Sequence, residues 1–303
     1  DRLLKAPSNQ RGRDFAIMLA AFNQLGYSVE WRVINAADYG RAQRRRRVFF
    51  FVFRNDTKWG ERLHTKYEAT LSNDADLNAR LDCYAPYIFE DGLFGRQFPV
   101  KNEAIKKRIN ANKLDEDIAE VSANFSDGKM WNSGLMTNGY YYTIETEPKG
   151  DEEPIPMKKI VVKENQVPED YYVDGEKLEK FKYLRGPKKI TRTAANGHTY
   201  TFSEGGMSEY DSLELPGRTM LTSEGSVNRS THLLKIDGKY RLITPIEAER
   251  LQDFPDDWTR YKRNTKGEVV EVSDRMRMFF MGNALVTGIV KRIGDELQKI
   301  DAI

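Results

Sequence analysis

The chain has 303 residues, a net charge of +2 and a single cysteine. One cysteine excludes an internal disulfide framework and a cysteine-cluster zinc site, and His64, His198 and His232 show no metal-ligand spacing. The longest apolar run, Phe15 to Phe22, is far shorter than the roughly 18 residues of a membrane span. We therefore expect a soluble intracellular protein without a metal.

Residues 1–54 predict the edge of an α/β sheet. They are strongly basic, with 11 Lys and Arg against 4 Asp and Glu. Over residues 12–25, apolar side chains recur every three or four positions, which is the period of a buried helix face. Ser28–Ile34 then alternates as a strand, and after a turn the continuous apolar run Val48–Phe53 predicts a strand covered on both faces.

Residues 55–240 differ from this segment in charge and in pattern. They contain 26 Lys and Arg against 31 Asp and Glu. They lack the alternation of α/β units and predict a separate, irregular α+β domain inserted into the sheet domain. Short helices are expected at Ala104–Ile109 and Leu114–Val121. Short strands are expected at Glu152–Val162, Val167–Val173, Thr199–Gly206, Arg218–Gly225 and His232–Ile236.

Residues 241–303 return to clear helical signals. Thr244 to Glu247 form a capping box with proline at the first helical position, which predicts a helix to about Gln252. A second helix is expected from near Ala284 to about Lys299, where apolar residues recur with helical spacing. Glu247 and Arg250 are expected to form a local ion pair.

Three blocks carry the specific signal: Ala37 to Arg47, which contains Gln-Arg-Arg-Arg-Arg before a strand; Thr-Pro-Ile-Glu-Ala-Glu-Arg-Leu at 244–251; and Gly-Asn-Ala at 282–284. In this order they resemble the last motif blocks, VIII, IX and X, of the DNA cytosine-5 methyltransferases. The resemblance covers residues 1–54 and 241–303 well and the middle loosely.

The resemblance implies an α/β, Rossmann-like methyltransferase sheet domain. Residues 1–54 would end the catalytic sheet domain, residues 55–240 would be an inserted target-recognition domain, and residues 241–303 would return to the catalytic domain. It also implies double-stranded DNA as partner, S-adenosylmethionine as cofactor, and methyl transfer to C5 of a flipped cytosine.

The family's Gly-rich cofactor loop, Pro-Cys nucleophile and Glu-Asn-Val block are not found in this sequence, which begins with Asp1. Cys83 lacks the preceding proline, so we expect a buried structural thiol. The sequence thus predicts a C-terminal portion with an incomplete cofactor site, inactive alone, with the missing N-terminal part as a partner. The alternatives are a non-catalytic DNA-binding module, one subunit of a split methyltransferase, or an RNA-modifying relative.

Gln43, Arg45 and Arg47 are the predicted catalytic residues. Residues two apart on a strand share a face, so Arg45 and Arg47 should point one way. Thiolate attack at C6 of cytosine pushes negative charge toward N3 and O2, where a guanidinium stabilises it without losing its proton. The resemblance assigns this role to Arg47, supported by Arg45, while Arg44 and Arg46 are expected to meet phosphates. A solvated basic turn is the alternative.

Gly282, Asn283 and Ala284 are the predicted cofactor-binding residues. A Gly-Asn turn at a helix start exposes backbone N–H groups that attract an anion such as the methionyl carboxylate. The family often has serine in place of Ala284, so one hydroxyl contact is lost here. The alternative is a plain helix cap.

DNA reading is expected in residues 177–240, with 11 Lys and Arg against 7 Asp and Glu. The predicted phosphate contacts are Lys182, Arg185, Lys188, Lys189 and Arg192. The predicted readers of base edges are Arg218, Asn228 and Arg229, with Asn196 and Ser223. The acidic residues 55–176 should face away from DNA, and a solvated charged face is the alternative for the whole region.

Overall fold

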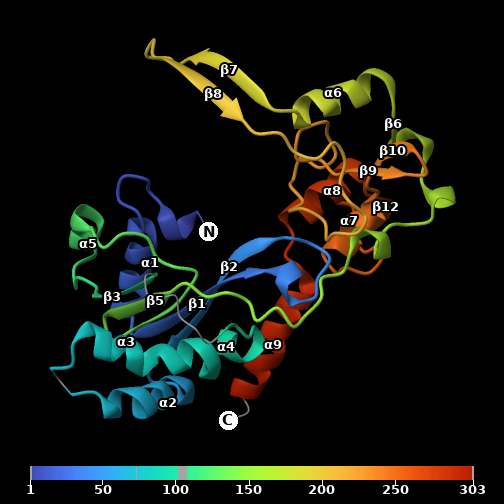
Figure 1. The fold of residues 1–303 in the computed structure, drawn as a ribbon. Helices are drawn as coiled ribbons and strands as arrows, with labels where there is room; N and C mark the ends of the chain where they lie inside the picture. The colour runs from blue at the N-terminus through green and yellow to red at the C-terminus, as the bar shows by residue number, and fades with distance from the viewer. Residues whose placement is uncertain (1, 73, 102–107, 302–303) are drawn as a thin grey trace. The chain divides into compact units, whose positions relative to one another are not determined.

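The computed structural model describes residues 2–72, 74–101 and 108–301, and the chain divides into two compact units (Figure 1). The first unit comprises Asp1–Tyr39, Arg46–Glu152 and Ile289–Ile303, and the second comprises Gly40–Arg45 and Glu153–Gly288. The basic block therefore changes unit between Arg45 and Arg46. Within the described residues, no helix is both long and apolar enough to span a bilayer.

The first unit is built on a five-stranded antiparallel sheet in the order β2-β1-β4-β5-β3. The strands are β1 (Tyr27–Asn35), β2 (Arg46–Arg54), β3 (Ile109–Lys113), β4 (Ser133–Thr137) and β5 (Tyr140–Ile144). β1 and β2 pair along their whole length, so both strands predicted in residues 1–54 are confirmed.

Helices cover both faces of this sheet. α1 (Arg13–Gln24) and α5 (Ile118–Asn124) pack on the face of β1 that carries Val29 and Trp31. α2 (Lys58–Tyr67) and α3 (Leu77–Pro86) pack on the other face, against Tyr142. α4 (Leu93–Gln97) and the later part of α9 (Thr287–Asp301) also belong to this unit.

The expected domain boundary at residue 55 is absent from this arrangement. β4 lies directly beside β1, with Val29 opposite Met136, so residues of the expected insertion form the centre of the first sheet. β2 is an edge strand, because β1 is its only strand neighbour in the described sheet. Its two faces are partly covered, with Val48 and Val52 on the α1 side and Phe51 and Phe53 on the α2 side. Of the two short helices expected, residues 104–107 of the first lie outside the described residues and Ile109 begins β3, while the second begins later, at Ile118.

Glu30 is a buried acid on β1 whose carboxylate accepts hydrogen bonds from the N–H groups of Leu93 (2.9 Å) and Phe94 (3.0 Å). Burial raises its pKa from 4.5 to about 7, against the opposing effect of Arg32. Its contribution to stability is therefore complete below about pH 4.5 and is lost as the pH rises to about 7.

We expect this loss to reach roughly 3 kcal/mol, at about 1.4 kcal/mol per pH unit. The measurement is urea unfolding at intervals from pH 4.5 to 7.5, for the wild type and for Glu30→Gln, which cannot ionise. The free energy of unfolding of the wild type, relative to that of Glu30→Gln, should fall as the pH rises across this window. Parallel profiles would contradict the prediction.

The second unit surrounds a short sheet in the order β6-β10-β9, formed by Tyr172–Val173, Lys239–Leu242 and Leu233–Ile236. Its helices are α6 (Gly175–Arg185), α7 (Pro245–Leu251) and α8 (Asp274–Asn283). Two hairpins stand apart from this sheet, β7 (Lys188–Thr193) with β8 (Thr199–Glu204), and β11 (Tyr261–Arg263) with β12 (Val269–Glu271). The core includes Met157, Met220, Leu234, Leu251, Met278 and Met281.

The capping box of α7 is confirmed, with Thr244 and Glu247 bonded reciprocally. The expected Glu247–Arg250 ion pair is wrong, because Glu247 pairs with Arg241 and Arg250 pairs with Asp256. The expected strands at 152–173 are mostly 3-10 turns, since only Tyr172–Val173 finds a strand partner. Residues 218–225 form a loop rather than a strand, and this unit continues past the expected boundary at 241 to Gly288.

Candidate functional site

Gln43 is a buried structural residue of the second unit. Its side-chain amide donates to the Leu251 carbonyl (3.0 Å) and accepts from the Met220 N–H (3.0 Å). The backbone on either side bonds to Gly217. The amide expected near the substrate base is therefore used to join three chain segments.

Arg45 is also buried, with a side-chain environment that differs from the sequence prediction. Its guanidinium donates to the carbonyls of Met220 (2.8 Å) and Gly282 (3.0 Å). It precedes β2, so the expected pairing with Arg47 on one strand face does not occur. Arg45 instead fixes the Met220 loop to the end of α8.

The remaining arginines of the block are more accessible. Arg44 is exposed in the second unit, while Arg46 and Arg47 begin β2 in the first. Arg47 is half-buried, and partial desolvation lowers the pKa of its guanidinium. One of its nitrogens donates to the Arg46 carbonyl (2.8 Å).

The Gly282–Asn283 turn ends a helix instead of beginning one. Asn283 is the last residue of α8, and the next helix starts at Thr287. The Ala284 N–H bonds to Phe280 and the Asn283 amide to Phe279, so these donors satisfy helix carbonyls. The expected anion site formed by free N–H groups at a helix start is therefore not present at this turn.

Gly282 is required by close packing. A Cβ added there would lie 2.4 Å from the Thr222 nitrogen, well inside contact distance. The loop after Met220 therefore lies directly against the end of α8. Arg45 and Gly282 together hold the loop and the predicted cofactor segment in one rigid arrangement.

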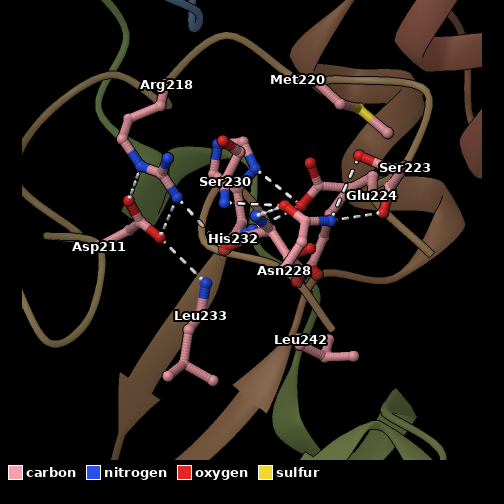
Figure 2. A network of polar contacts seen from close by, with 12 residues as sticks. Asp211, Arg218, Met220, Ser223, Glu224, Asn228, Ser230, His232, Leu233 and Leu242 are labelled. Atoms are coloured by element: carbon pink, nitrogen blue, oxygen red, sulfur yellow. Dashed lines mark hydrogen bonds and ion pairs between the residues drawn. The ribbon is translucent and has the colours of Figure 1, made fainter. Parts of the chain in front are cut away.

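The loop between Asp211 and Leu233 is folded by buried charges (Figure 2). Asp211 accepts from Arg185 (2.8 Å) and Arg218 (2.5 Å), and also from the Leu233 N–H (2.9 Å). Although burial acts to raise the pKa of Asp211, these arginines and His232 hold it well below its usual range.

A second buried pair closes the same loop. Oε1 of Glu224 accepts from the backbone N–H of His232 (2.5 Å) and lies 2.9 Å from its Nδ1. Burial acts to lower the pKa of His232, but the adjacent Glu224 raises it above its ordinary value. Figure 2 shows Asn228 beside this pair, with its side-chain oxygen accepting from the N–H groups of Ser230 and Thr231.

A model of the C-5 cytosine-specific DNA methylase family matches residues 3–299. The chain belongs to that family. It is 50% identical over 303 residues to the Type II methyltransferase M.Sau3AI of Staphylococcus aureus. This alignment covers 100% of the chain and 66% of M.Sau3AI. It is 40% identical over 45 residues to the Type II methyltransferase M.NlaIV of Neisseria lactamica, or 15% of this chain and 11% of the relative. The chain thus spans just under two thirds of the length of M.Sau3AI.

In this member of the family, several arginines predicted to touch DNA are buried or half-buried. Arg185 is 1% exposed, and it cannot contact a phosphate in this conformation. Arg218 shares Asp211 with it, and Arg229 pairs with Glu204 (3.0 Å). The physical reason is the same in each case: a buried or half-buried guanidinium lies against internal acceptors, which replace the solvent that it has lost.

Most of the other predicted DNA contacts are on the surface of the second unit. Lys182 is exposed and pairs with Glu179 (2.8 Å), while Lys188 is largely covered and pairs with Glu204 (3.3 Å). Lys189 and Arg192 are exposed on the β7–β8 hairpin. Sequence reasoning did not recognise this hairpin as a unit, although Asn196-Gly197 between residues rich in threonine is a typical hairpin signal.

Proposed function

We propose that this chain supplies the DNA-recognition part and one side of the base and cofactor pockets of a DNA (cytosine-5-)-methyltransferase. The complete enzyme would transfer the methyl group of S-adenosylmethionine to C5 of a cytosine drawn out of duplex DNA. The observation that carries this proposal is the 50% identity to a Type II methyltransferase over the whole chain. The family match over residues 3–299 supports the same chemistry.

Arg47 is our proposed contact to the cytosine. It is half-buried at the start of β2, a setting in which its fixed positive charge is less screened than in open water. A guanidinium near O2 would stabilise the negative charge that develops when a thiolate adds to C6. Arg45 and Gln43 are positioning residues in this scheme, and Arg44 and Arg46 remain proposed phosphate contacts.

The cofactor contacts are proposed more narrowly. Asn283 is exposed at the end of α8 and offers a side-chain amide. Gly282 allows the loop after Met220 to lie against the end of α8. The Ala284 N–H already donates to the Phe280 carbonyl, so this residue would only line the pocket, and the segment would form one wall of it. S-adenosylmethionine supplies the methyl group when bound, and this segment would help to orient it.

The nucleophile is proposed to come from outside these 303 residues. Cys83 is the one cysteine of the chain, and it lies on α3 with its thiol directed at the Tyr67 carbonyl (3.0 Å). It packs against the aromatic cluster of the first unit, which suits a structural thiol. β2 supports the same idea, because a sheet edge is a place where a further strand can add.

The test is methyl transfer from radiolabelled S-adenosylmethionine to mixed duplex DNA. We expect no incorporation by this chain alone, and incorporation after co-expression with the part of M.Sau3AI that lies outside the match. Turnover by these 303 residues alone would overturn the proposed need for a nucleophile from outside them. DNA binding without methylation in the co-expressed pair would favour a non-catalytic DNA-binding module.

A further inference from the structure

The β7–β8 hairpin is a two-stranded ribbon that projects from the second unit. It pairs from Lys188 opposite Glu204 to Thr193 opposite Thr199, and no third described strand joins it. Between Lys189 and Ser203, every residue is exposed except Ala194 and Phe202, which are half-buried. Figure 1 shows the ribbon extending away from α6 and the rest of its unit. An isolated hairpin of this kind is marginally stable in water, so a bound partner would order it.

The two faces of the ribbon differ in chemistry. Residues directly opposite each other share a face, so one face carries Lys189 with Ser203, Thr191 with Thr201, and Thr193 with Thr199. This threonine face presents five hydroxyl groups and one ammonium group. The other face carries Ile190, Arg192, Tyr200 and Phe202, with the Arg192 guanidinium 4.1 Å from the centre of the Phe202 ring. The aromatic face therefore stiffens the ribbon, and the threonine face is left for a polar ligand.

The charge of the ribbon favours a polyanion. Residues 189–203 include Lys189, Arg192 and His198 and contain no Asp or Glu. The acid at the base, Glu204, is paired with Lys188 (3.3 Å) and Arg229 (3.0 Å). The part of the ribbon beyond Glu204 is therefore uniformly basic or neutral.

We propose that this ribbon enters the major groove of duplex DNA, with its threonine face toward the base edges and Lys189 on a phosphate. The inference rests on the proposed function, which makes duplex DNA the substrate. The major groove is about 12 Å wide and accommodates a two-stranded ribbon. Threonine hydroxyls donate to or accept from base edges, and threonine methyls contact the thymine methyl.

The test uses the full chain and a duplex enriched by affinity selection from a random-sequence pool. Thr191→Val combined with Thr201→Val removes two hydroxyls and keeps the β-branched shape that favours strands. We expect roughly ten-fold weaker binding of the selected duplex, by loss of base contacts. Protection of guanine N7, a major-groove atom, from dimethyl sulfate should be lost as well. Lys189→Gln should reduce the slope of log K against log salt concentration by about 1.

Matched controls are Thr65→Val and Lys149→Gln, which alter exposed residues of the first unit. Both should leave affinity, N7 protection and salt slope unchanged. Unchanged binding and N7 protection in the Thr191→Val, Thr201→Val variant would overturn the ribbon inference and leave the proposed function standing. Absence of duplex binding by the wild type would overturn both. Self-association that this variant abolishes, without change in DNA binding, would instead make the ribbon a contact between copies of the chain.

Discussion

Glu247→Ala should destabilise the second unit by roughly 3 kcal/mol, near the lower end of the cost of breaking a buried ion pair, because Arg241 keeps Glu164 as a second partner (3.0 Å). Glu247 is completely buried, and its carboxylate accepts from two guanidinium nitrogens of Arg241 (2.8 and 2.9 Å). It also accepts from the N–H groups of Thr244 (2.7 Å) and Val162 (2.9 Å). Alanine would remove the capping box of α7 and the fully buried one of the two carboxylates that pair with Arg241.

We would measure this effect by urea unfolding, with hydrogen exchange of the α7 amides as the readout. This readout reports on the second unit alone. Asp256→Ala is the matched control, because it breaks an accessible ion pair with Arg250 but leaves Arg250 bonded to the Ile160 carbonyl (2.9 Å), and it should cost less than about 1 kcal/mol. Replacing both Arg241 and Glu247 by apolar residues of similar size should recover part of the loss. A cost for Glu247→Ala no larger than that of the control would contradict the buried-charge argument.

Local signals in the sequence predicted the elements that depend on local interactions. The helix at 13–24, the strands at 27–35 and 46–54, and the capping box of α7 all follow from periodicity or spacing over a few residues. The β4–β5 hairpin was missed although its signal was present. Asn138-Gly139 occupies its turn with positive φ at both residues, as a two-residue hairpin loop requires.

The arginines show where sequence reasoning must fail. Charge counts identified residues 177–240 as basic, but they do not reveal that Arg185 and Arg218 share Asp211. That pairing depends on a loop closing between distant positions, which no local pattern records. Arg45 is a similar case, since both of its carbonyl partners lie more than 170 residues away. The resemblance identified the family correctly, and the structure gives the arginines of the block surroundings that differ from those expected.

Arg47→Met and Arg45→Met should separate chemistry from scaffold within this block. In the co-expressed two-part enzyme, Arg47→Met should lower kcat by roughly 10²–10³, the usual cost of losing one group that stabilises developing negative charge. The free energy of unfolding should hardly change, because the side chain is half-exposed and, among the described residues, it donates to the adjacent Arg46 carbonyl.

Arg45→Met should act in the opposite way. The carbonyls of Met220 and Gly282 would lose their donor inside the second unit, and each unsatisfied group costs roughly 1–3 kcal/mol. Thermal unfolding should report that loss, and DNA binding and kcat should fall with it, because the loop and the α8 turn would no longer be held together. Arg44→Met, an exposed control, should alter mainly the salt dependence of DNA binding. If Arg47→Met leaves kcat intact while Arg45→Met abolishes it at full stability, the base contact belongs to Arg45, and the buried geometry must open when DNA binds.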